Sequence, residues 1–206
     1  HEITESKIIA EITNDKNQTE LVELRFYGHQ LSEGKLKVLP IAHRGVCYQP
    51  PNNYDGIYPS NTTPAFEAAL ASGYKGFELD VRVTKDKRFV ISHDGDLSVA
   101  TTLHGYVKDK NLAEFQNAMV IKSAFIPEKK STAYEAFIAA PIEPLNDVLK
   151  KFIDDPRLEK MVVDIKPDTD ENILAAAKYD FEGLTEAQQK KIFFLTRTES
   201  SAKILK

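Results

Sequence analysis

Two acidic residues, Glu78 and Asp80, stand two positions apart in the segment GFELDVRV (76–83). This segment alternates apolar and polar residues, which is typical of a β-strand. Side chains two positions apart in a strand project from the same face, so both carboxylates should point the same way. Neighbouring carboxylates repel unless a cation or a proton lies between them, and hard divalent ions prefer such oxygen ligands. The spacing therefore predicts a divalent-cation site, although a strand with a solvated acidic face would show the same pattern.

Two histidines end short apolar segments on either side of this acidic pair. His43 closes the segment LPIAH (39–43), and His93 closes FVISH (89–93). Histidine is the side chain best suited to give and take protons near neutral pH. A single histidine in such a place is usually structural. Two at equivalent positions around a carboxylate pair indicate an acid/base pair.

Three further residues extend the set. Asp164 and Lys166 repeat the two-residue spacing in KMVVDIK (160–166), which makes Asp164 a third candidate metal ligand and Lys166 a candidate phosphate ligand. A plain salt bridge between them is the alternative. Arg44 offers a guanidinium fork that suits phosphate. Since no serine or cysteine stands out as a nucleophile, the set predicts phosphoester chemistry on a small-molecule phosphodiester.

The elements that must position these residues alternate between strands and helices. The predicted strands cover 39–43, 76–81, 89–93, 160–165 and 191–196. The predicted helices cover 62–73, 142–155, 171–179 and 199–206. Such alternation is typical of a parallel α/β sheet. Because polar residues end several successive strands, the pattern favours a TIM (β/α)8-type barrel over an open doubly wound sheet, whose site lies at one switch point.

The bulk composition is that of an ordinary globular protein of 206 residues, with 42% hydrophobic and 28% charged residues. The net charge of −4 disfavours a general nucleic-acid binder, and no apolar run approaches the roughly 18 residues of a transmembrane segment. Cys47 is the only cysteine, which excludes an intrachain disulfide. We expect residues 1–37 to form an N-terminal extension with a strand at 21–28, and residues 38–206 to form the barrel domain.

Several segments resemble the glycerophosphodiester phosphodiesterases and follow one another in that family's order. They are AHRG (42–45), PSNTTPAFEAAL (59–70), GFELDVRVTKD (76–86), VISHDGDL (90–97) and VDIK (163–166). The resemblance implies a TIM barrel that hydrolyses glycerophosphodiesters to glycerol 3-phosphate and an alcohol. It also favours an extracytoplasmic or secreted location, which the sequence otherwise leaves open.

The resemblance also implies roles for all seven candidate residues: a proton-transferring pair (His43 and His93), ligands for Mg²⁺ or Ca²⁺ (Glu78, Asp80 and Asp164), and phosphate ligands (Arg44 and Lys166). The substrate's own glycerol hydroxyl would attack phosphorus through a cyclic phosphate, which explains the absent protein nucleophile. The chain departs from the family at Ser60, where a glutamate is usual, and at Asp164, which also replaces a glutamate.

Two other functions stay open. Phospholipase D-like action on lysophospholipid or sphingolipid is one, because the related spider-venom-type enzymes also have an aspartate at the position of Asp164. A non-catalytic fragment that binds a phosphodiester or a partner chain is the other. A metal-free phosphatidylinositol phospholipase C shares the fold, but Glu78 and Asp80 argue against it.

Length sets a further expectation. A TIM barrel takes about 250 residues, and only about 170 follow the start of the first predicted strand. Five predicted strands leave three of the eight unaccounted for. We expect the chain to be part of a longer protein, with completion by a second chain or second copy, or a reduced barrel, as the alternatives.

Overall fold

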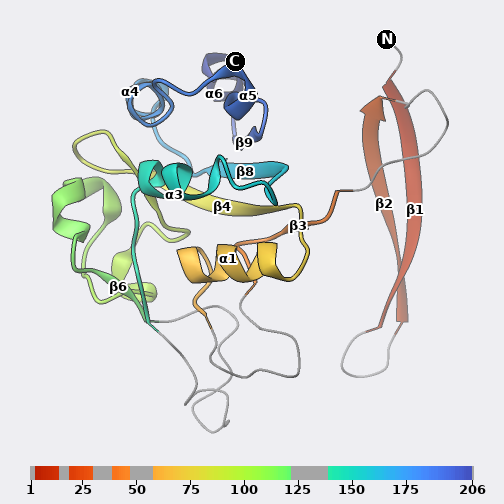
Figure 1. Cartoon of the computed structure of the whole chain (residues 1–206), viewed down its shortest axis with the longest axis horizontal. Helices are drawn as coiled ribbons and strands as arrows, with labels where there is room; N and C mark the ends of the chain where they lie inside the picture. Colours follow the sequence, from red (N-terminus) through yellow and green to blue (C-terminus); the bar gives the residue numbers. More distant parts are fainter. Residues whose placement is uncertain (1–2, 14–18, 30–38, 47–57, 122–138, 206) are drawn as a thin grey trace, which may run out of the picture. The chain divides into compact units, whose positions relative to one another are not determined.

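The computed structural model describes residues 3–13, 19–29, 39–46, 58–121 and 139–205. The chain separates into two compact units, His1–Val38 and Leu39–Lys206. In the first unit, strands β1 (Ile3–Thr13) and β2 (Thr19–His29) form a two-stranded antiparallel sheet (Figure 1). The strand predicted at 21–28 is confirmed within β2.

The second unit is built on a mixed sheet with a parallel path (Figure 1). Its parallel strands, in spatial order, are β3 (Ile41–Ala42), β4 (Gly76–Val83), β8 (Lys160–Ile165) and β9 (Ile192–Leu195). Strand β5 (Phe89–Ile91) pairs with β4, and two short strands, β6 (Met119–Val120) and β7 (Ala140–Pro141), pair with each other. The predicted parallel α/β architecture is confirmed, and in the described residues the sheet does not close into a barrel.

The direction of β5 corrects one prediction. The sequence suggests a further parallel strand at 89–93, but β5 runs antiparallel to β4, with Val81 opposite Ile91. A tight turn joins the two strands, in which the Thr84 backbone nitrogen donates to the Arg88 carbonyl at 2.9 Å. Parallel neighbours need a long crossover connection. The short turn between β4 and β5 therefore permits only an antiparallel hairpin. The described part of the chain thus has four parallel strands rather than five.

The α-helices described in the second unit are the four predicted ones and one that was not predicted, at Glu186–Gln189. They are α1 (Thr63–Ala71), α3 (Leu145–Phe152), α4 (Asp170–Asp180), α5 (Glu186–Gln189) and α6 (Glu199–Ile204), with 3₁₀ helices at Leu97–Val99, Val107–Asp109 and Leu112–Phe115. None of the helices in the described residues is long and apolar enough to cross a membrane.

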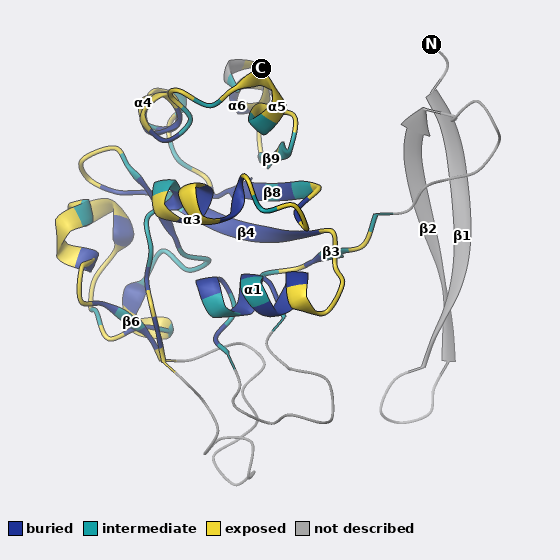
Figure 2. Cartoon of the chain, viewed as in Figure 1, coloured by how far each residue is buried: buried dark blue, intermediate teal, exposed yellow. Residues whose placement is uncertain are grey.

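One face of the sheet packs against helices and forms the core, seen as the dark blue of β4, β8 and α1 in Figure 2. Phe77, Leu79 and Val81 of β4 are fully buried on this face. The Phe77 ring stacks on Phe66 of α1, with centroids 4.5 Å apart, and meets Phe152 of α3 edge-on at 5.2 Å. Because side chains alternate along a strand, this packing leaves the residues between them for the other face.

The other face of the sheet, which we call the site face, carries the acidic residues. The strand register places Asp80 beside Asp164, and Asp164 beside Leu195. Val162 stands beside Phe193 in the same way. Phe193 and Leu195 are 53% and 51% exposed. The site face therefore combines a buried acidic patch with an uncovered apolar strip on β9.

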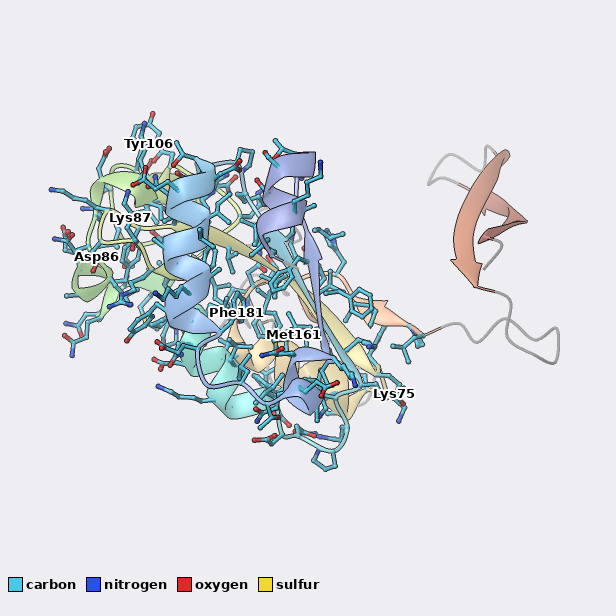
Figure 3. All side chains as sticks on the ribbon, turned by 90° about the horizontal axis from the view of Figure 1, so that it is seen from above. Lys75, Asp86, Lys87, Tyr106, Met161 and Phe181 are labelled. Carbon is cyan, nitrogen blue, oxygen red and sulfur yellow. The ribbon has the colours of Figure 1, made fainter. Side chains whose placement is uncertain are left out.

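Figure 3 looks along the sheet from above, with Lys75 just before β4 and the turn residues Asp86 and Lys87 beyond its far end. Phe181, which follows α4, lies against the core. Its ring packs against Phe89 of β5 and Phe194 of β9, with centroids 6.3 and 5.1 Å away. The residue after α4 thus packs against both β5 of the hairpin and the outer parallel strand β9.

A buried acid ties α4 to the hairpin. Asp180 is 2% exposed, and its Oδ2 accepts a hydrogen bond from the Phe89 backbone nitrogen at 3.0 Å. Burial raises the pKa of Asp180 to about 6, although this hydrogen bond and the charge of Arg88 act in the opposite direction. The ionised carboxylate therefore costs folding free energy.

We expect Asp180→Asn to gain stability relative to the wild type as the pH rises from about 4 to about 6. The folded carboxyl holds its proton to a higher pH than the unfolded one, so wild-type stability falls through this window. The difference should reach roughly 3 kcal/mol above the folded pKa. Urea unfolding across this range measures it, with the exposed Asp109→Asn as control. Parallel pH profiles for the wild type and Asp180→Asn would contradict a buried-charge cost.

Candidate functional site

The turn after β3 brings His43 and Arg44 to the site face. Arg44 and Gly45 both adopt positive φ, at +59° and +79°. A Cβ on Gly45 would lie 2.6 Å from the backbone carbonyl carbon of Ala65 in α1, so only glycine fits there. The Arg44 backbone nitrogen donates to Glu78 Oε2 at 3.0 Å. The turn therefore packs closely against α1, and its backbone holds the Glu78 carboxylate in place by a hydrogen bond.

Three carboxylates converge next to this turn. Glu78 and Asp80 share one face of β4, and Asp164 lies beside Asp80 on β8. One oxygen from each of the three lies within 4.8 Å of the others. All three residues are buried, with exposed fractions of 7%, 0% and 8%. The predicted same-face spacing thus produces an acidic cluster that could hold a divalent cation.

Cationic side chains lie against the cluster. Lys166 Nζ is 2.5 Å from Asp80 Oδ1 and donates to Asp164 Oδ2 at 2.8 Å. Arg44 Nε lies 3.0 Å from Asp80 Oδ2. Arg197, which follows β9, places its Nη2 3.5 Å from Asp164 Oδ2. The salt bridge that the sequence suggested between Asp164 and Lys166 is present, and Lys166 also crosses to Asp80 on the neighbouring strand.

Asn61 belongs to the site although the sequence did not single it out. Its Nδ2 donates to Asp80 Oδ2 at 2.7 Å, and its Oδ1 accepts from the Asp80 backbone nitrogen at 3.1 Å. The Asn61 backbone has φ +60° and its nitrogen donates to the Arg44 carbonyl at 3.0 Å. An asparagine just before a helix reads as an ordinary turn residue, so the only signal was its place in the segment PSNTT. Arg197 was missed too, although it follows a predicted strand.

The two carboxylates of β4 differ in proton affinity. Burial and the charge of Asp80 raise the pKa of Glu78 to about 7, against the hydrogen bond from the Arg44 nitrogen. Burial also acts to raise the pKa of Asp80, but hydrogen bonds from Lys166 and Asn61 outweigh it and hold this pKa below its usual value. Below about pH 7, Glu78 therefore keeps a proton that a cation could replace.

The donor set fits a hard divalent cation. All three groups are carboxylates, the ligand type that Mg²⁺ and Ca²⁺ prefer. Asp164 Oδ1 is buried and accepts no hydrogen bond from any described residue. A buried carboxylate oxygen without a partner is costly, and a metal ion would satisfy it. Among the described residues, Glu78, Asp80 and Asp164 could therefore hold the ion.

The two histidines lie at the rim of this cluster. His43 Nε2 is 3.8 Å from Glu78 Oε2, and its side chain is 65% exposed. Burial and the charge of Arg44 lower the pKa of His43. His93 returns to the cluster because β5 is antiparallel, and the preceding Ser92 nitrogen donates to the Asp80 carbonyl at 3.0 Å. His43 thus contacts a carboxylate by its side chain, whereas the chain at His93 is tied to β4 through the backbone of the preceding residue.

A cavity of about 250 Å³ is lined by two residues that contact Asp80. The residues around it include Arg44, Ser60, Asn61, His93 and Asp94. His93 Nδ1 lies 3.1 Å from Asp94 Oδ1, a contact that orients the imidazole ring. Ser60 lines the same space. A phosphodiester in this cavity could lie between the imidazole of His93 and the guanidinium of Arg44.

Residues 43–205 match the model of the glycerophosphoryl diester phosphodiesterase family. The chain is 33% identical over 151 residues to a glycerophosphodiester phosphodiesterase from Caldanaerobacter subterraneus subsp. tengcongensis. This match covers 71% of the chain and 56% of that protein. The chain therefore spans little more than half the length of this relative.

Solved structures agree in fold. The glycerophosphodiester phosphodiesterase of Agrobacterium tumefaciens matches with a TM-score of 0.56 and 20% identity over 80% of the chain and 60% of that structure. An Oleispira antarctica phosphodiesterase, solved with its product sn-glycerol 3-phosphate, matches with a TM-score of 0.54 and 22% identity over 81% of the chain and 61% of that structure. At such identities the likeness concerns the fold alone. The match covers 60% and 61% of the two solved structures.

Glu78→Gln should weaken divalent-cation binding by at least about tenfold, because even outer partners of a metal site are worth about 10–100-fold. The wild type should bind the ion less tightly as the pH falls below about 7, since the Glu78 proton then competes with it. The variant should lack this dependence. Thermal shifts on adding Mg²⁺ or Ca²⁺, read at several pH values, measure both effects.

The exposed Glu182 supplies the matched control, because Glu182→Gln removes the same charge away from the cluster. A full thermal shift in Glu78→Gln would remove Glu78 from the ligand set.

Proposed function

Because the chain belongs to the glycerophosphoryl diester phosphodiesterase family, we propose that it hydrolyses glycerophosphodiesters to glycerol 3-phosphate and an alcohol. The observation that carries this proposal is the buried cluster of Glu78, Asp80 and Asp164 with Lys166 against it. The bound sn-glycerol 3-phosphate of the Oleispira phosphodiesterase is the product that such a reaction would leave.

The three carboxylates would hold Mg²⁺ or Ca²⁺. The bound ion would neutralise charge on the phosphoryl oxygens. Arg44 lines the cavity and would bind a phosphate oxygen there, while its Nε keeps contact with Asp80. Lys166 would exchange part of its ion pairing with the carboxylates for a phosphate oxygen once the added positive charge lies between them.

The two histidines would move the protons. One imidazole takes the proton from the substrate's glycerol hydroxyl, whose oxygen bonds to phosphorus while the bond to the alcohol oxygen breaks. The other imidazole gives a proton to that leaving oxygen. Water then opens the cyclic phosphate with the roles reversed, and glycerol 3-phosphate leaves. The exposure of His43 and His93, 65% and 41% for their side chains, leaves both open to substrate.

One observation keeps phospholipase D-like action as a second candidate. Ser60 lines the cavity where the family has glutamate, and Asp164 is the shorter acid shared with those enzymes. The short Ser60 side chain leaves more room in the cavity than a glutamate would. Turnover of lysophosphatidylcholine in preference to glycerophosphocholine would favour this candidate.

His43→Ala and His93→Ala should each lower kcat for glycerophosphocholine by about 10²–10⁴. Their melting temperatures should stay close to that of the wild type, because both side chains are exposed. A coupled assay for glycerol 3-phosphate measures the rate, and His104→Ala, an exposed histidine outside the cavity lining, is the matched control.

The same assay tests the metal. EDTA should abolish wild-type turnover, and added Mg²⁺ or Ca²⁺ should restore it. Turnover that persists in EDTA would overturn the mechanism. Absence of turnover with every phosphodiester would favour the non-catalytic alternative.

We also propose that catalysis resides in the second unit and that the hairpin of the first unit is an extension to it. The remaining strands of the barrel would pair along the outer edge of β9 and cover Phe193 and Leu195. These residues share the face of Asp164 and are more than half exposed. The strands would come from the same polypeptide, with a second chain or a second copy as the alternatives.

The 206-residue chain alone should therefore associate in solution and show a mass above 23.2 kDa. The double variant Phe193→Ser/Leu195→Ser should shift it toward the monomer, because it removes the apolar strip. Light scattering after gel filtration measures the mass. Leu174→Ser, at a 49% exposed position on α4, is the control. A monomeric mass for the wild-type chain would contradict the proposal that this apolar strip is an uncovered part of the barrel interior.

A further inference from the structure

Arg82 is the third polar residue on the site face of β4. It follows Glu78 and Asp80 at the same two-residue spacing, so its side chain leaves the strand on their side. Beyond Asp80 the parallel neighbour β8 pairs only as far as Val81. The Arg82 side chain thus lies past the carboxylate cluster, where β5 and the residues after it return.

The segment that follows β5 loses its backbone pairing with β4 just before His93. The β4–β5 ladder ends at Val81 opposite Ile91, and the Ser92 nitrogen adds one further bond to the Asp80 carbonyl. The next carbonyl, that of His93, accepts instead from Arg82 Nε at 2.9 Å. A side-chain donor therefore takes over where the ladder stops, at the residue that carries the imidazole.

The turn after His93 folds over the same guanidinium. A Cβ on Gly95 would lie 3.4 Å from Arg82 Nη1, so the glycine backbone packs closely against it. The Gly95 carbonyl accepts from the Val107 nitrogen at 2.9 Å, which fixes the turn from its other side. Arg82 is half-buried, and the charges that act on it in this position include Asp94 and Asp168. The guanidinium is thus held in place on several sides.

We infer that Arg82 is the positioning residue for His93. This inference rests on the proposed function and deepens it. The hydrogen bond from Nε fixes the His93 carbonyl relative to Asp80, and the imidazole then takes its orientation from Asp94. Arg82 contacts the backbone of His93, so it acts through this residue on the reacting atoms. Misplacement of a proton carrier by about 1 Å is enough to slow a reaction substantially.

Two variants separate the hydrogen bond from the charge. Arg82→Met ends at the position of Nε, so it removes both the donor and the guanidinium beyond it. Arg82→Gln loses the charge, but its amide nitrogen occupies the same place along the side chain as Nε and can still donate. We expect Arg82→Met to lower kcat by about 10–100-fold with little change in KM, and Arg82→Gln to recover most of the loss. Arg88→Met is the matched control, since Arg88 stacks on Tyr179 instead.

A double-mutant cycle with His93→Ala tests whether Arg82 acts through His93. In that background Arg82→Met should change kcat little further, because the group that it positions is gone. A merely structural role would lower kcat by the same factor in both backgrounds, and that result would overturn the inference. Wild-type kcat in Arg82→Met would do so as well. Absence of turnover in the wild type itself would instead overturn the proposed function, and the inference with it.

Discussion

The interaction on which the rest of the site depends is the repulsion between Asp80 and Asp164. They are neighbours in the strand register, and Glu78 adds a third carboxyl on the same face. Two like charges about 4 Å apart repel by about 4 kcal/mol at an effective dielectric constant of about 20. Lys166 offsets this cost by contacting both aspartates. Even so, burial together with the charge of Asp80 raises the pKa of Glu78 to about 7.

The backbone around the cluster is shaped to support this concentration of charge. On the edge of β4 opposite β8, β3 pairs with Gly76 and Phe77 and β5 begins at Val81, so the ladder has a gap from Glu78 to Asp80. Asn61 fills that gap with hydrogen bonds to both the backbone and the carboxylate of Asp80. Arg44 and Asn61 adopt positive φ, a conformation that is uncommon for arginine and that asparagine tolerates better than most residues. The site is thus held by side chains that replace missing strand pairing.

The sequence was sufficient for features that depend on local periodicity. The alternation in β4 placed Glu78 and Asp80 on one face, and the repeated spacing in β8 placed Asp164 there too. The parallel α/β order was predictable because helices separate the parallel strands. The direction of β5 was not, since it depends on a short turn, and this led to one parallel strand too many. Asn61 and Arg82 were missed because their roles lie in contacts to the backbone of other segments, which no periodic pattern reveals.

The central proposal is that the carboxylate cluster binds a divalent ion next to the phosphate. Paramagnetic relaxation of the ³¹P nucleus of glycerol 3-phosphate, with Mn²⁺ as the divalent probe, tests this most directly. The wild-type protein should speed ³¹P relaxation strongly when protein, Mn²⁺ and glycerol 3-phosphate are all present, and Glu78→Gln should lose most of that effect at the same Mn²⁺ concentration. Equal relaxation in the two proteins, or none in the wild type, would show that the phosphate does not bind beside an ion held by this cluster.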